Sequence, residues 1–278
     1  MNNKGVLGAI LGDMVGSTRE LNNVRTEDFE LLPNGSGYTD DTVMTLAVAE
    51  WLMRDSTHSK QVLIKCMQRL GRQYLFLPYG RSFRSWLKEE NPKPYNSCGN
   101  GSAMRVSPVG LYANSLEEAL ELAKISAEVS HNHQEGIKGA QAIAACVYLS
   151  KMQKSKDEIK QYVEHQFGYN LSGDLRERRN TYCLDVTCQG SVPIAIMAYL
   201  QESTLLSQLR LAISMGGDSD TIGSMSASIA MAPLLSIIKK VDLQELVRQC
   251  RSLLSPDLLD INDRFLKFLK IRQIELAY

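Results

Sequence analysis

Apolar residues recur at helical spacing along most of the chain, whereas segments with the two-residue alternation of a strand are scarce. In residues 42–54, for example, the apolar side chains at positions 43, 46, 47 and 51 share one helical face. This pattern predicts an all-α fold of roughly ten or more helices. No Pro- or Ser-rich linker interrupts the pattern and no segment repeats at a fixed period, so we expect one compact domain over residues 1–278.

Several of the expected helices carry signals for their ends. Residues 115–118 and 155–158 each have the form of a capping box, and the second of these helices is expected to end at Gly168. The helix in "STLLSQLRLAISMGG" is expected to stop at its two final glycines. Pro256 fits the first turn of the last helix, because a proline there loses no helical hydrogen bond.

The charge balance narrows the class of partner. Of the 278 residues 44% are hydrophobic, and 31 basic residues are matched by 31 acidic ones. Without excess positive charge, nucleic acid and membranes are not expected partners, and a protein or small molecule is favoured. The N-terminal apolar run is broken by Asp13 and no small-x-small cleavage site follows, so we expect no signal peptide and a cytoplasmic protein, which we take to be a monomer. The six cysteines lack C-x-x-C spacing and are expected to be free thiols, most of them buried.

Two acidic stretches far apart in the sequence share one design. "YTDDTVMTL" places Thr39, Asp40 and Asp41 at the start of one expected helix, and "GGDSDTIGS" places Asp218, Asp220 and Thr221 at the start of another. One interpretation is that Thr39 and Asp218 are ordinary N-caps and the other aspartates favour the helix dipole. A cap needs one side-chain oxygen, however, whereas each stretch supplies two carboxylates and a hydroxyl. That surplus of hard oxygen ligands suits Mg²⁺ or Mn²⁺.

The residues around the second acidic stretch predict close packing. The two glycines before Asp218 free the backbone for a tight entry into the helix. Small residues then recur between positions 223 and 230, which allows this helix to approach its neighbours closely.

Two other interpretations of these motifs are weaker. "DSDT" matches the start of the haloacid-dehalogenase phosphatase motif, but that motif follows a buried parallel strand, and the segment before Asp218 is helical. "HNHQE" suggests zinc, but His131 and His133 would point to nearly opposite sides of a helix and could not share one ion. A role at a helix start, or in support of the site, is favoured for these histidines.

Five motifs in order give the chain a resemblance to a known family. They are "GAILGDMVGSTRE", "YTDDTVMT", "GNGSAMRVSPVG", "SHNHQEGIKGAQAIA" and "GGDSDTIG". Together they resemble the opening helix, first metal motif, substrate loop, central helix and second metal motif of the ADP-ribosylglycohydrolase family. "TCQGSVPIAIMAYL" is also similar; there we expect residues 189–191 to shape the entry of a helix that starts at Pro193.

The resemblance implies an all-helical fold with two Mg²⁺ or Mn²⁺ ions at the bottom of a cleft. Carried over position by position, the implied ligands are Thr39, Asp40, Asp41, Asp218, Asp220 and Thr221. Glu20 falls where the family often places a mobile glutamate, and a solvated surface Glu is the alternative at this position. Asp40 or Glu20 is the expected catalytic acid or base.

The glycine-rich stretch at residues 98–105 is the expected cradle for the diphosphate of ADP-ribose or its adjoining ribose. Gly99 and Gly101 are expected to leave backbone N–H groups exposed, Ser102 to add a hydroxyl and Arg105 a charge. Asn100, within the same turn, and His131 complete the expected substrate-binding set.

The implied function is a metal-dependent hydrolase that removes ADP-ribose from a modified side chain, with arginine favoured. The first alternative is a catalytically silent relative that binds ADP-ribose, although all six implied ligands are intact. The second is a hydrolase of another linkage, to serine, a nucleic-acid base or a small metabolite. Residues 20–37 are the expected rim that selects among these acceptors.

Overall fold

The computed structural model describes residues 6–20, 22–233 and 241–275. Within these ranges every regular element is a helix, and the one β-type pairing is an isolated bridge between Gly99 and Thr187. The helices are α1 Leu7–Gly16, α2 Asp40–Arg54, α3 Lys60–Gln73, α4 Arg81–Lys88, α5 Gly101–Met104, α6 Ser107–Tyr112, α7 Leu116–Glu128, α8 Gln134–Lys151, α9 Lys156–Phe167, α10 Leu175–Arg178, α11 Cys188–Gln201, α12 Leu205–Ser214, α13 Ser219–Met231, α14 Val241–Leu253 and α15 Pro256–Glu275. The prediction of an all-α fold is confirmed.

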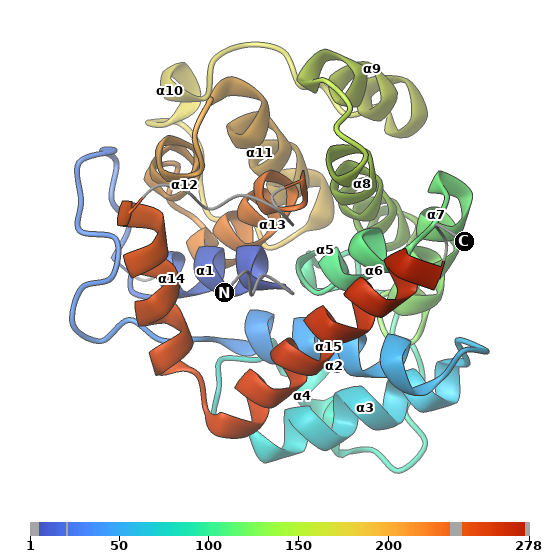
Figure 1. The fold of residues 1–278 in the computed structure, drawn as a ribbon. Helices are drawn as coiled ribbons and strands as arrows, with labels where there is room; N and C mark the ends of the chain where they lie inside the picture. Colours follow the sequence, from blue (N-terminus) through green and yellow to red (C-terminus); the bar gives the residue numbers. More distant parts are fainter. Residues whose placement is uncertain (1–5, 21, 234–240, 276–278) are drawn as a thin grey trace.

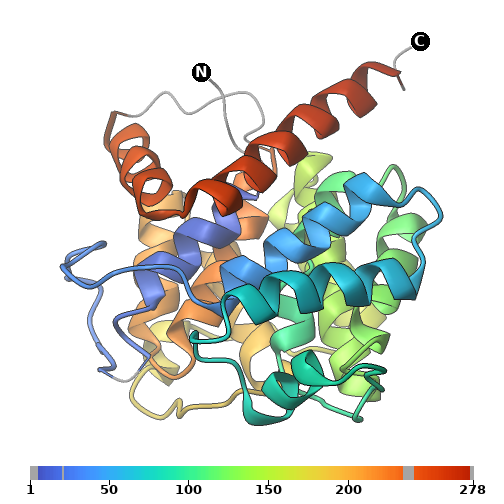
Figure 2. The ribbon, with the colours of Figure 1, turned by 90° about the horizontal axis from the view of Figure 1, so that it is seen from below.

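Helix α13 lies at the centre of the molecule, beside α1 and among α8, α11 and α12 (Figure 1). The next layer holds α2 and α3, and α14 and α15 lie across one face of the other helices (Figure 2). The apolar core runs as one continuous cluster through these layers. The two acidic stretches start α13, at the centre, and α2, in the adjoining layer, and these two helices are in contact.

Helices α1 and α13 touch along a seam of small residues. Gly8, Gly12 and Gly16 repeat every fourth residue on one face of α1. A Cβ built on Gly12 would lie 2.1 Å from the Gly223 carbonyl oxygen, and one on Gly16 would lie 2.4 Å from the Asp220 Cα. The expected close approach of α13 to a neighbouring helix is thus confirmed, and that neighbour is α1. Sequence reasoning did not predict that the glycines of α1 contribute to this contact.

Most expected helix ends agree with the structure. Ser155 and Glu158 form a complete capping box, and Gly168 ends α9 at a φ of 67°. Ser115 caps α7 by accepting the Glu118 N–H at 3.1 Å, but the Glu118 carboxylate accepts from the Asn114 N–H instead of closing the box. The two glycines at 216 and 217 lie just beyond α12, and α15 begins at Pro256.

The expected start of a helix at Pro193 is wrong. Helix α11 begins at Cys188, five residues earlier, and Pro193 lies inside it. The Thr187 hydroxyl accepts the Gly190 N–H at 3.2 Å, and this cap fixes the earlier start. Residues 189–191 therefore form the first turn of the helix.

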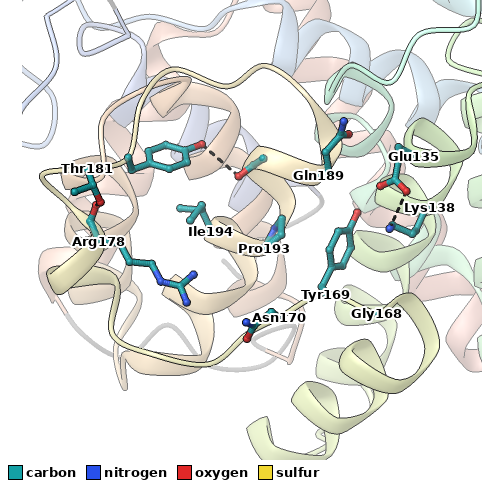
Figure 3. Close-up of a pocket in the computed structure, with 12 residues that line it drawn as sticks. Glu135, Lys138, Gly168, Tyr169, Asn170, Arg178, Thr181, Gln189, Pro193 and Ile194 are labelled. Atoms are coloured by element: carbon teal, nitrogen blue, oxygen red, sulfur yellow. Dashed lines mark hydrogen bonds and ion pairs between the residues drawn. The ribbon is translucent and has the colours of Figure 1, made fainter.

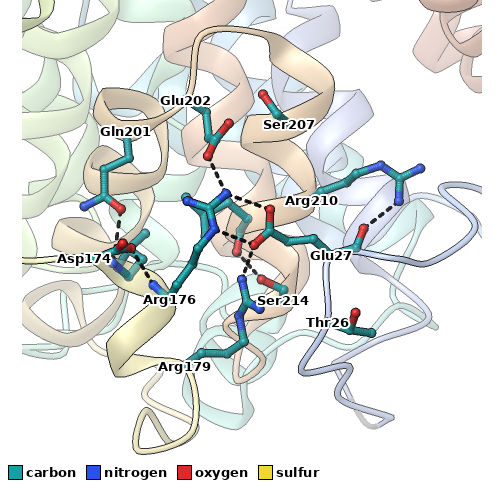
Figure 4. A network of polar contacts seen from close by, with 12 residues as sticks. Thr26, Glu27, Asp174, Arg176, Arg179, Gln201, Glu202, Ser207, Arg210 and Ser214 are labelled. Atoms are coloured by element: carbon teal, nitrogen blue, oxygen red, sulfur yellow. Dashed lines mark hydrogen bonds and ion pairs between the residues drawn. The ribbon is translucent and has the colours of Figure 1, made fainter.

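Residues 22–36 run without helix along the outside and are held by arginines (Figure 4). Arg176 pairs with Glu27 at 2.8 Å and with Glu202 at 2.6 Å, and Arg179 also pairs with Glu27. Arg210, on α12, donates to the Glu27 and Phe29 carbonyl oxygens at 2.8 and 2.6 Å. These contacts join the expected rim to α10, α11 and α12.

All six cysteines are free thiols, and four of them are buried. None of the helices in the described part of the chain is long and apolar enough to cross a membrane.

Candidate active site

A cleft of about 550 Å³ opens where α2, α13 and the segment before α5 meet. Its walls include most of the side chains that the sequence singled out: Glu20, Asp40, Asp41, Gly99, Asn100, Gly101, Arg105, His131, Asp218, Asp220 and Thr221. Thr39 and Ser102 are absent from the lining. Tyr95 and Phe83, which sequence reasoning missed, also line the cleft, and both rings contact the ring of His131. The cleft thus has an acidic part and an aromatic part.

The two acidic stretches are joined directly, although they are 180 residues apart. The Thr221 hydroxyl donates to Asp41 Oδ2 at 3.1 Å. The other Asp41 oxygen, Oδ1, is buried, and no atom of the described residues pairs with it. A buried carboxylate oxygen without a partner is costly unless a cation or a donor meets it.

The electrostatics of the cleft reflect crowded carboxylates. Burial, and then the charge of Asp13, raises the pKa of Asp40 to about 7. Burial and the neighbouring Asp220 raise the pKa of Asp41, and burial and Asp218 raise that of Asp220. Burial, Asp218 and Asp13 likewise raise the pKa of Glu20. The acidic end therefore favours cations or protons over further negative charge.

Asp13 belongs to this cluster although sequence reasoning did not select it. It is fully buried in α1, and it accepts the Thr39 and Thr42 N–H groups at 2.9 and 3.1 Å and the Thr42 hydroxyl at 2.5 Å. Burial raises its pKa to about 6 although these hydrogen bonds act in the opposite direction. An aspartate inside the apolar helix "LGAILGDMVG" was the available signal. Asp13 fastens α1 to the start of α2.

Thr39 and Asp218 behave differently from one another at their helix starts. The Thr39 hydroxyl caps α2 by accepting the Asp41 N–H at 3.2 Å. Asp218 occupies the N-cap position of α13 but makes no capping hydrogen bond; its Oδ2 accepts from the Asn100 side chain at 2.6 Å. The ordinary-cap interpretation thus holds for Thr39 and is wrong for Asp218.

The donor set fits a hard divalent cation. Asp40, Asp41, Asp218, Asp220 and Thr221 present carboxylate and hydroxyl oxygens to one cleft, and the partnerless Asp41 Oδ1 is among them. Among the described residues no three His, Cys, Asp or Glu side chains already converge at coordinating distance. Ligation would accordingly require small side-chain movements toward the ion.

The glycine loop, residues 97–101, differs from the expected open cradle. The Gly99 N–H donates to Ser97 Oγ at 3.0 Å, and the Asn100 N–H donates to the Val186 carbonyl at 2.9 Å. Two of the three amides are thus already used, because the loop is tied down by its own turn and by the neighbouring segment. The Gly101 N–H has no backbone or side-chain acceptor within the part of the chain that the structure describes.

The expectations for Ser102 and Arg105 need correction. The Ser102 hydroxyl donates to the Gly136 carbonyl at 2.7 Å, so it faces α8 and cannot contact a ligand in the cleft. Arg105 borders the cleft but is only 1% exposed, and its guanidinium donates to the Ser126 carbonyl at 2.7 Å. Both side chains turn inward because buried acceptors on neighbouring helices hold them.

The two histidines of "HNHQE" have separate roles. His133 caps α8 by accepting the Glu135 N–H at 3.1 Å. His131 precedes α8, is 5% exposed and borders the cleft. The sequence argument against zinc assumed that both histidines lie on one helix, whereas neither lies within a helix. The expected role of His133 at a helix start is confirmed.

These motifs, their order and their meeting in one cleft agree with comparisons to known proteins. A family model described as ADP-ribosylglycohydrolase matches residues 4–234. The chain belongs to the ADP-ribosylglycohydrolase family. Membership supports hydrolysis of a bond to ADP-ribose as the general activity.

Individual relatives have low sequence identity to this chain, but their alignments cover most of it. ADP-ribosylhydrolase ARH3 of Mus musculus is 27% identical over 305 residues, which cover 81% of this chain and 81% of the relative. ARH3 of Homo sapiens is also 27% identical, with 81% and 83% covered. A solved structure described as an ADP-ribosylglycohydrolase-related protein complex superposes with a TM-score of 0.66 at 22% identity, covering 95% of this chain and 98% of that one. This last likeness concerns the fold.

Beside the ADP-ribosylglycohydrolase cleft lies a second cavity of about 770 Å³ (Figure 3). Arg178 reaches into it from one side and Tyr169 stands on the other, with Pro193 and Ile194 between them. Gln189, in the first turn of α11, also lines this cavity. The segment between α10 and α11 contributes Tyr182 to this cavity and Val186 to the cleft, so it separates the two.

Proposed function

We propose that this protein is a metal-dependent hydrolase that cleaves the glycosidic bond between ADP-ribose and a modified side chain. The observation that carries the proposal is the meeting of both acidic stretches with the glycine loop, through the bonds from Thr221 to Asp41 and from Asn100 to Asp218. Cation ligands and a loop suited to ADP-ribose thereby share one cleft.

Two Mg²⁺ or Mn²⁺ ions would be held by side chains of both acidic stretches: Asp40, Asp41, Asp218, Asp220 and Thr221, with Thr39 as a further candidate. When bound, such ions orient ribose hydroxyls and lower the pKa of a bound water. The ligand set contains only hard oxygen donors, in keeping with these cations.

The chain's own residues have distinct tasks in the reaction. The Gly101 N–H is available to a diphosphate oxygen, and Tyr95 and Phe83 offer apolar surface to the rest of the substrate. As water attacks C1 of the ribose and the bond to the acceptor breaks, Asp40 or Glu20 takes the water's proton. That proton then passes to the departing acceptor group. Burial raises the pKa of both carboxyl groups, which makes each a stronger base than an ordinary exposed carboxylate.

Arginine-linked ADP-ribose is the first substrate to test. The residues named above would contact the ribose and diphosphate, which are common to all ADP-ribosyl linkages. The group to which ADP-ribose is attached must therefore be identified by comparing substrates with different linkages. Proteins or peptides modified on arginine and on serine, and ADP-ribosylated nucleic acid, should be assayed side by side for release of free ADP-ribose.

The decisive experiment measures that release with chelator and with added Mg²⁺ or Mn²⁺. We expect turnover only with metal, and a loss of at least about a hundredfold in Asp220→Asn, because an amide cannot supply the anionic charge. Asp157→Asn, a change of an exposed aspartate on α9, is the matched control and should keep full activity. Metal-independent turnover, or full activity of Asp220→Asn, would sink the proposal. Binding of ADP-ribose without turnover on any linkage would favour the silent relative.

A further inference from the structure

Arg105 is a buried cation with no carboxylate partner in the described part of the protein. Its Nη2 donates to the Ser126 carbonyl at 2.7 Å and to the Ser130 hydroxyl oxygen at 3.0 Å. Burial lowers the pKa of its guanidinium to about 10, which still leaves it charged at neutral pH. A buried charge that is stabilised by a carbonyl and a hydroxyl, rather than by an acid, polarises those groups.

The hydrogen bonds of Ser130 determine where its proton goes. The Ser130 side chain is fully buried, and its oxygen lies 2.8 Å from His131 Nδ1. Because Arg105 can only donate, the Ser130 oxygen is an acceptor in that contact. The Ser130 O–H then has one available acceptor among the described residues, which is His131 Nδ1. If Nδ1 carried a proton, the buried hydroxyl proton would have no acceptor, at a cost of about 1–3 kcal/mol.

The other nitrogen of His131 faces the cleft. A Cβ built on Gly101 would lie 3.0 Å from His131 Nε2, and one on Gly99 would lie 3.6 Å away, so Nε2 borders the glycine loop. No atom of the residues that the structure describes makes a hydrogen bond with Nε2. The residue is 5% exposed, and its ring contacts the rings of Tyr95 and Phe83 at centroid distances of 5.6 and 6.1 Å. This polar atom is therefore held in place and left for a ligand.

We propose that Arg105 and Ser130 form a relay that fixes His131 as the neutral tautomer with its proton on Nε2, aimed as a hydrogen-bond donor at an oxygen of bound ADP-ribose. Arg105 and Ser130 are positioning residues, since neither touches the ligand. The identity of the ligand rests on the proposed function, whereas the relay itself rests on the hydrogen bonds of the free protein.

The charge state of His131 agrees with this arrangement. Burial, and then the nearby charge of Arg105, lowers its pKa well below the usual range for histidine. The imidazole is therefore a neutral hydrogen-bond donor. It can bind an acceptor such as a phosphate or hydroxyl oxygen, but not a group that only donates, such as ammonium.

Nuclear magnetic resonance of the ¹⁵N-histidine-labelled protein tests the relay directly. The chain has four histidines, so a His131→Phe variant assigns the signal. At neutral pH we expect an unprotonated Nδ1 and a protonated Nε2. Ser130→Ala should produce a mixture of tautomers, and Ser130→Thr should restore the single one. A proton on Nδ1 in the wild type, or an unchanged tautomer in Ser130→Ala, would overturn the proposal.

Ser126→Ala is the matched control. Ser126 lies in α7, shortly before Ser130 in the chain, and its buried hydroxyl has no partner among the described residues. Its carbonyl, which accepts from Arg105, is unchanged by the substitution. It should keep the wild-type tautomer.

Titration with ADP-ribose then separates the relay from the enzyme activity. The His131 Nε2–H signal should shift on saturation, and Ser130→Ala should bind ADP-ribose about five- to tenfold more weakly, while Ser126→Ala binds normally. No shift at saturation, or equal affinity in Ser130→Ala, overturns the role of the donor. Absence of hydrolysis on every linkage with these binding results intact would reject the proposed function and leave the relay standing.

Discussion

Asp41 shows how the site differs from an ordinary pair of helix caps. One of its oxygens accepts the Thr221 hydroxyl, and the other is buried with no partner among the residues that the structure describes. In the chelated protein, Asp41→Asn should leave the free energy of unfolding unchanged or raise it, because one of several like charges is removed. The same change should reduce the stabilisation given by Mg²⁺ or Mn²⁺.

Thermal melts of wild type and Asp41→Asn, each with chelator and with excess metal, check this prediction. With metal at about a hundred times its Kd, the wild type should gain about 2.7 kcal/mol. An isolated capping aspartate would behave otherwise, since Asn is also a good cap and metal would be irrelevant. If metal stabilises neither protein, the metal site is wrong.

The raised pKa values of the acidic cluster predict an unusual pH dependence for the chelated protein. The pKa of Asp13 is about 6 and that of Asp40 about 7, against about 3.9 in an unfolded chain. Between these limits the folded state binds more protons, so the free energy of unfolding should fall as pH rises from about 4 to about 7. Urea unfolding at several pH values with chelator measures this slope. Saturating metal should flatten it at the upper end, and a rise in stability over the same range would contradict the prediction.

At the scale of elements, the seam between α1 and α13 is the contact most sensitive to added volume. A methyl group on Gly12 would lie 2.1 Å from a backbone oxygen of α13, so the two helices must separate to accept it. Gly12→Ala should lower the free energy of unfolding by about 3 kcal/mol and weaken metal binding, because Asp13 and Asp220 flank this seam. Gly37→Ala is the control, since no atom lies within 4 Å of its added Cβ. Urea unfolding of both variants decides the matter, and equal stabilities would show that the seam tolerates a methyl group.

Helix existence and most helix ends were predictable because they depend on local chemistry. The Ser155 box and the entry at Pro256 need only residues within one turn. The prediction that a helix starts at Pro193 was wrong. The N-cap at Thr187 sets an earlier start, and Pro193 is accommodated within the helix. The local sequence pattern predicts that a helix forms. The position of its first residue depends on which of several possible N-caps is the most stable.

At the scale of the whole molecule, most residues selected from the family resemblance line one cleft, but the resemblance did not predict the directions of their side chains. Ser102 and Arg105 share a short turn with Gly101, yet both point inward because Gly136 and Ser126 offer buried carbonyl acceptors. Those acceptors lie 34 and 21 residues away along the chain, so the sequence around the turn does not contain them. Asp13 was missed for the same reason: its partners, Thr39 and Thr42, lie on another helix.

If the proposed function is right, the hydrogen bond between Asn100 and Asp218 couples binding of the cation to binding of ADP-ribose. The Asn100 amide would lie in the loop beside ADP-ribose and the Asp218 carboxylate in the cation site, so binding of either ligand would affect the other. Reciprocity then requires that the factor by which saturating Mg²⁺ tightens ADP-ribose equals the factor by which saturating ADP-ribose tightens Mg²⁺. Calorimetric titrations in both orders should give one common factor above unity, and Asn100→Ala should bring it toward one. A fall in the concentration of free Mg²⁺ would then lower both the affinity for the product ADP-ribose and the rate of hydrolysis.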